Sequence, residues 1–79
     1  MARVLLFGPL RDVAGWRERD VAASSITELK ALLAADDPAL FAALNGKGVQ
    51  VGVDQAITRG EVHLGAQAEV AFLPPMSGG

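Results

Sequence analysis

The sequence predicts a small α+β domain in which one main helix packs on one face of a mixed sheet of four or five strands. Two observations carry this prediction. The most apolar runs lie near the two ends of the chain, at 4–7 and 69–73, and a segment with a helix-start signal lies between them. The 79 residues, of which 51% are hydrophobic, suffice for one domain with one core. Residues 1–79 are therefore expected to form a single domain.

The first part of the chain predicts two strands joined by a helical turn. Residues 4–7 form a continuous apolar run that a Gly-Pro pair ends, as expected of a central strand. Residues 10–14 are too few for an independent helix and predict a helical turn that Gly15 closes. The run at 16–22 is rich in charge and predicts an edge strand.

The clearest local signal marks the start of the main helix. Ser25 and Glu28 have the spacing of a capping box, in which the serine side chain caps the helix and the glutamate reaches back. An Asp-Asp-Pro sequence at 36–38 ends or breaks the helix. The apolar face between these points consists of Ile26, Leu29, Leu32 and Leu33.

The second part of the chain predicts mostly strand. Valines alternate with Gln50 and Gly52 along 49–53, as in a strand with one buried face, and 56–58 predicts a short extended piece. Residues 69–73 predict the last strand. Because the first and last strands are the most apolar, they are expected to lie side by side at the centre of the sheet. The segments that remain predict a helical turn at 40–44 and turns at 45–48 and 54–55.

Composition argues against several classes of function. The net charge is −2, the isoelectric point is near 5.1 and no basic run occurs, which argues against nucleic-acid binding. Cysteine is absent, and the single histidine, His63, predicts a solvent-facing strand residue, so no metal site is expected. The apolar run at 4–7 is too short for a signal peptide or a membrane span. We therefore expect a cytoplasmic protein with no membrane partner.

No motif inside the domain predicts an active site. The sequence Gly46-Lys47-Gly48 lacks the upstream glycine and the following hydroxyl residue of a phosphate-binding loop, so it predicts a turn. The acidic pair Asp36-Asp37 stands beside a proline and predicts a solvated helix end rather than a pair of catalytic carboxyl groups.

The chain end carries the strongest functional signal. Pro74 and Pro75 stop the last strand, because proline cannot continue a sheet interior. Gly78 and Gly79 have no Cβ atom, so they can pass through a slot that would reject other residues and deliver the terminal carboxylate into a partner's active site. Ser77 and both glycines bury no apolar area, which predicts that the end of the tail (residues 74–79) is disordered after Met76 in the free protein, while Pro74 and Pro75 stiffen its base.

Three segments of the chain resemble a known family. They are the strand Val4-Leu5-Leu6-Phe7 with the following Arg11-Asp12-Val13-Ala14-Gly15, the step Val53-Asp54-Gln55, and the whole end from Glu69 to Gly79 with its Pro-Pro pair. The chain resembles the small subunits of molybdopterin synthase, which are ubiquitin-like sulfur carriers with a β-grasp fold. The family usually has Gly-Asp where this chain has Gln67-Ala68, and Asn where it has Asp54.

The resemblance implies a defined chemistry for Gly79. An adenylyltransferase similar to ubiquitin-activating enzymes would adenylate the Gly79 carboxylate with ATP, and a sulfur donor protein would convert it to a thiocarboxylate. The tail would then enter the large subunit of molybdopterin synthase, in a heterotetramer, and give its sulfur to a pterin precursor. The resemblance implies that the carrier binds no cofactor and is not an enzyme on its own.

The same resemblance implies a contact surface for the large subunit. It places Phe7, Ile57 and Leu73 in this contact, with Pro74, Pro75 and Met76 at the base of the tail. Strand alternation supports an exposed apolar set, because the helix covers only one face of the sheet.

Three other functions remain open. The same tail would serve a sulfur carrier for thiamine synthesis or tRNA thiolation, or a ubiquitin-like tag that forms an amide with a lysine. An interaction module with an inert Gly-Gly end is the third. The Pro74-Pro75 pair favours the molybdopterin pathway, since the thiamine carriers share the two glycines but generally lack the prolines.

Overall fold

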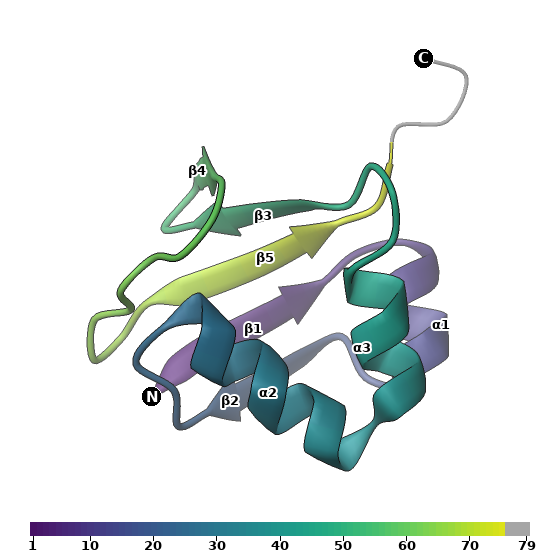
Figure 1. The fold of residues 1–79 in the computed structure, drawn as a ribbon, viewed down its shortest axis with the longest axis horizontal. Coiled ribbons are helices and arrows are strands. Elements are labelled where there is room, and N and C mark those ends of the chain that lie inside the picture. Colours follow the sequence, from purple (N-terminus) through teal and green to yellow (C-terminus); the bar gives the residue numbers. More distant parts are fainter. Residues whose placement is uncertain (76–79) are drawn as a thin grey trace.

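The first and last strands pair side by side at the centre of a mixed sheet, as the sequence predicts (Figure 1). The structure is a computed structural model that describes residues 1–75. Strand β1 (Ala2–Leu6) runs parallel to β5 (Glu69–Leu73), and all other pairs are antiparallel. The five strands have the order β2-β1-β5-β3-β4, with β2 (Glu18–Val21), β3 (Gln50–Val53) and β4 (Ala56–Thr58).

Helix α2 (Ile26–Asp36) starts at the predicted capping signal. The Ser25 hydroxyl accepts a hydrogen bond from the Glu28 N–H at 3.1 Å. The Glu28 carboxylate accepts one at 2.6 Å from the N–H of Ser24, one residue before the cap. Two backbone donors at the helix start are thus paired with side-chain oxygens, which fixes where the helix begins.

A further helix follows α2 directly. Asp37 ends α2 and caps α3 (Pro38–Leu44), because its side chain accepts a hydrogen bond from the Leu40 N–H at 3.1 Å. Pro38 occupies the first turn of α3, where the missing N–H has no partner to lose. The expected helical turns at 40–44 and 10–14 are therefore complete short helices, α3 and α1 (Pro9–Ala14).

The core lies between the helices and one face of the sheet. Phe72 of β5 is fully buried beside Leu6 of β1, and Val70 and Val4 form the next buried pair on the same face. Leu32, expected on the apolar face of α2, is 44% exposed and lies outside the core. The helices supply Leu10, Ile26, Leu29, Leu33, Leu40 and Leu44 to the core.

Two other expectations need adjustment. The edge strand is confirmed as β2 but is shorter than the predicted 16–22, and half-buried Trp16 before it packs against the core. His63 is exposed, as expected, but it forms an isolated bridge with Ser25 rather than lying in a strand.

Among the described helices, none has the length and apolar character needed to cross a membrane.

Candidate functional site

Pro74 and Pro75, the described base of the tail, follow the end of the central strand β5 (Figure 1). Strand β5 pairs with β1 on one side and with β3 on the other, and its last residue, Leu73, pairs with Gln50 of β3. Pro74 and Pro75 follow directly and have no N–H to continue either ladder. The paired part of β5 therefore ends at Leu73, and Pro74 and Pro75 lie just beyond it.

Two glycines from other parts of the chain make room for these prolines. A Cβ atom on Gly8, after β1, would lie 3.1 Å from Cγ of Pro74. A Cβ atom on Gly48, before β3, would lie only 2.7 Å from Cβ of Pro75. Both glycines have positive φ, +57° and +85°, which side chains disfavour. We call Gly8, Gly48, Pro74 and Pro75 the tail clamp.

The clamp was not predicted from the sequence, although its glycines stand in the turns that the sequence marks. The expected tail residues Met76, Ser77, Gly78 and Gly79 lie outside the described residues. Their predicted flexibility and chemistry therefore stay predictions.

The face of the sheet away from the helices carries a row of apolar residues. The strand registers place Leu5, Ala71, Gly52 and Ile57 side by side across β1, β5, β3 and β4. Ile57 is 54% exposed, while Leu5 and Ala71 are half-buried. We call this side of the sheet the open face, and part of its apolar set is exposed as strand alternation predicts.

The three residues that the resemblance assigns to a partner contact all lie outside the buried core. Ile57 belongs to the row just described, and Leu73 is half-buried one alternation nearer the tail. Phe7 follows β1, is half-buried, and shares the wall of a small hollow with Leu5. The structure thus brings the three onto the open face or beside it, with Leu73 and Phe7 near its tail end and Ile57 level with the middle of β5.

Arg11 is a further ordered group beside Phe7. Its Nε donates a hydrogen bond to the Leu6 carbonyl oxygen at 2.9 Å, and its guanidinium carbon lies 5.5 Å from the centre of the Phe7 ring. The guanidinium therefore covers one side of the ring and places a cation close to the tail clamp.

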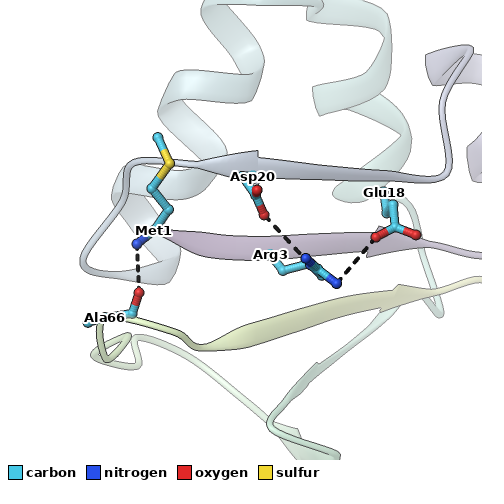
Figure 2. Close-up of polar contacts among 5 residues, drawn as sticks. All are labelled: Met1, Arg3, Glu18, Asp20 and Ala66. Carbon is cyan, nitrogen blue, oxygen red and sulfur yellow. Dashed lines mark hydrogen bonds and ion pairs between the residues drawn. The ribbon is translucent and has the colours of Figure 1, made fainter.

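The far end of the open face is charged (Figure 2). Arg3 lies between Glu18 and Asp20, with N–O distances of 3.5 and 3.6 Å, and all three side chains are at least half exposed. Such exposed pairs contribute little to stability. The Met1 amino group donates a hydrogen bond to the Ala66 carbonyl oxygen at 2.6 Å at the same end. The N-terminus and the tail therefore lie at opposite ends of the sheet.

One ionisable group outside the tail region has a displaced pKa. The side chain and the backbone N–H of Thr27 hydrogen-bond to the Glu61 carboxylate and lower its pKa, with a smaller effect from the Val62 N–H. Because Thr27 lies in the first turn of α2, this carboxylate also accepts a hydrogen bond from a backbone N–H that has no partner within the helix.

Among residues 1–75, no cluster of three potential metal ligands occurs.

Comparison with known proteins places this geometry in a family. The model of the ThiS family matches residues 4–79. The crystal structure of small archaeal modifier protein 1 from Haloferax volcanii has 26% identity and a TM-score of 0.80, over 99% of this chain and 98% of that one. The solution structure of small archaeal modifier protein 1 from Methanosarcina acetivorans has 24% identity and a TM-score of 0.85, over 99% and 95%. No curated protein matches the chain. The ubiquitin-like β-grasp fold is confirmed.

Proposed function

Because the chain belongs to the ThiS family of ubiquitin-like sulfur carriers, we propose that it carries sulfur as a thiocarboxylate on Gly79. The tail clamp is the observation that supports this most directly. Its two glycines lie close against Pro74 and Pro75 at the end of the central strand, and four more residues ending in Gly-Gly follow in the sequence. A carboxylate at the end of such a segment can enter a narrow slot in another protein while the domain stays outside.

Gly79 needs activation because a carboxylate is a poor electrophile. An adenylyltransferase of the ubiquitin-activating type transfers AMP from ATP to the Gly79 carboxylate and releases pyrophosphate. A sulfur donor protein then displaces AMP and leaves sulfur on the Gly79 carbonyl carbon. A partner slot that excludes water protects the product from hydrolysis.

We propose the large subunit of molybdopterin synthase as the partner that consumes the sulfur. The Pro74-Pro75 pair supports this choice, and the clamp gives the pair a physical role in directing the tail. The open face, with Ile57 exposed and Phe7 and Leu73 half-buried near its tail end, supports the proposed contact, since exposed apolar patches often mark protein partners. The large subunit supplies the catalytic residues and this chain supplies sulfur as a co-substrate.

Intact-mass spectrometry tests the carrier function. Protein incubated with the adenylyltransferase, ATP and a sulfur donor should gain one sulfur in place of one oxygen, located on Gly79 by fragmentation. A variant with one residue added after Gly79 keeps the fold and should gain nothing. A chain that forms neither adenylate nor thiocarboxylate under these conditions would contradict the proposal.

A protein tag is the second candidate function. The likeness to two structures named small archaeal modifier proteins favours it, together with the same activated Gly79. A tag would form covalent adducts of higher mass on a denaturing gel, whereas a carrier would give only the thiocarboxylate.

A further inference from the structure

Strand β2 has one edge that no other strand covers among residues 1–75, because β2 stands first in the strand order. The Leu6 N–H donates a hydrogen bond to the Arg17 carbonyl oxygen at 2.9 Å, so backbone groups at odd-numbered positions of this segment point toward β1. The N–H and C=O groups of Glu18 and Asp20 then point toward the free edge. This edge therefore offers backbone donors and acceptors to a further strand.

A groove of about 380 Å³ lies between β2 and α2, on the helix side of the sheet. Its apolar lining consists of Val21, Ala22, Leu32 and Leu33. Val21 pairs with buried Ala2, so its side chain belongs to the helix side, and Leu32 is 44% exposed on α2. The Arg19 guanidinium crosses from β2 to the Asp36 carboxylate at 2.8 Å and forms part of the wall. The groove can therefore take apolar side chains from a strand beside β2.

The opposite side of β2 is acidic (Figure 2). Glu18 and Asp20 pair with Leu5 and Arg3 of β1, so their side chains share the open face. Arg3 approaches both carboxylates from β1, at N–O distances of 3.5 and 3.6 Å, and supplies one positive charge for two negative ones. Because the two acidic side chains are 50% and 59% exposed, they can still meet a cation from the free edge.

We propose that the free edge of β2 binds an extended peptide segment of a partner protein in which basic and apolar residues alternate. The segment adds a strand through hydrogen bonds to Glu18 and Asp20. Its residues opposite these two lie on the open face, where a lysine or arginine meets a carboxylate. The residues between them point to the helix side and place apolar side chains in the groove beside Leu32.

The charge pattern argues against a second copy of this chain as the occupant. When two β2 edges pair antiparallel, residues whose backbone groups point outward must stand opposite each other. The registers with the most overlap then place Glu18 opposite Asp20, or one of these residues opposite its own copy. Like charges directly opposite destabilise a sheet, so the same carboxylates that disfavour a second copy favour a basic segment.

A blocked seven-residue peptide that alternates lysine with valine is the probe. In an NMR titration of the labelled full chain, the signals of Asp20 and Leu32 should shift and saturate below about 1 mM peptide, while Ile57 at the other edge stays unchanged. The Glu18 and Asp20 amides should exchange with solvent about tenfold more slowly, because they become donors to the added strand. A control peptide of the same composition, with all lysines before all valines, should give no such protection.

Three variants separate the two halves of the site. The double variant Glu18→Gln, Asp20→Asn keeps side-chain shape and should weaken peptide binding roughly three- to tenfold, by removing both charges. Leu32→Ala should weaken it about fivefold by shortening the groove wall. Val13→Ala on α1 is the matched control, because Val13 is also 44% exposed and lies outside the groove, and it should bind as wild type does. Circular dichroism checks that each variant is folded.

Several results would overturn the proposal. Equal binding of the two peptides, or shifts without amide protection, would mean charge attraction without an added strand. Unchanged binding by Leu32→Ala would mean that the groove stays empty. Amide protection that grows with protein concentration in the absence of peptide would assign the edge to a second copy. The site uses neither Gly79 nor the activating enzyme, so these results leave the proposed sulfur carriage untouched.

Discussion

The substitution Gly48→Ala tests whether the tail clamp guides the tail, and its effect on the stability of the domain can be measured separately. The substitution places a methyl group at φ +85° and 2.7 Å from the Cβ of Pro75. The left-handed backbone costs a non-glycine residue about 1–2 kcal/mol. For a domain of this size, that corresponds to a fall in Tm of roughly 4–16 °C. Pro75 is exposed, so it can move aside instead of straining the core.

Gly60→Ala is the matched control. Gly60 has φ +74°, and a Cβ atom there meets nothing within 4 Å, so the variant has the backbone strain without the contact. We expect the two variants to unfold within about 0.5 kcal/mol of each other, since the strain is alike. Only Gly48→Ala should shift the NMR signals of Leu73 and Pro74 and slow thiocarboxylate formation.

The assays are thermal unfolding by circular dichroism, ¹³C-edited NMR and a time course of intact mass. Equal rates of thiocarboxylate formation in both variants would show that the clamp does not guide the tail. A loss of stability in Gly48→Ala more than about 2 kcal/mol beyond that of Gly60→Ala would show that Pro75 cannot move, which would refute the argument from its exposure.

Three further predictions concern the open face, the core and one carboxylate. Ile57→Asp should weaken binding to the large subunit at least tenfold, measured by calorimetry, yet change the free energy of unfolding by less than about 1 kcal/mol. The control Leu32→Asp, at an exposed position of a helix, should leave binding unchanged. Equal effects of the two substitutions on binding would show that Ile57 is not in the contact. Phe72→Ala should cost about 3–5 kcal/mol in denaturant unfolding, because the ring is fully buried; a loss below about 1 kcal/mol would contradict its place in the core. Glu61 has a pKa below its ordinary value of 4.5, so its stabilising effect is present above that pH and disappears as pH falls through the lowered value. Wild type should therefore exceed Glu61→Gln in stability near neutral pH and lose this advantage in acid, whereas a constant difference would mean that Thr27 does not favour the charged form.

The sequence predicted the elements whose signals are local. Ser25 and Glu28 mark the start of α2 because a cap depends on residues only a few positions apart. The central position of β1 and β5 was predicted from their apolar character, because a strand with neighbours on both edges has little contact with water. The sequence predicts only a helix end at Asp37 and Pro38, because it does not show that the pair that stops α2 also begins α3.

The site was predictable only in part, for a physical reason. The sequence alone predicts a role for Gly78 and Gly79, and the resemblance assigns Ile57 to a partner contact; both stay predictions. The contacts of Gly8 with Pro74 and of Gly48 with Pro75 join turns to a strand end that is remote in the chain. Such a contact depends on strand order and register, so no local pattern carries it. Arg11 over Phe7 depends likewise on how α1 folds back on β1.

The parallel pairing of β1 with β5 has a mechanical consequence. The chain starts at one end of this pair and the tail leaves at the other, so tension applied between Met1 and the tail acts along both strands in opposite directions (Figure 1). The hydrogen bonds between them are then stretched together, in shear, and must break at once. Pairing of β5 with β3 on its other side adds a second set of bonds that resists sliding. A force that pulled β4 from the sheet edge would instead open its bonds one after another. The domain should therefore resist extension through its tail far better than unravelling from its edge.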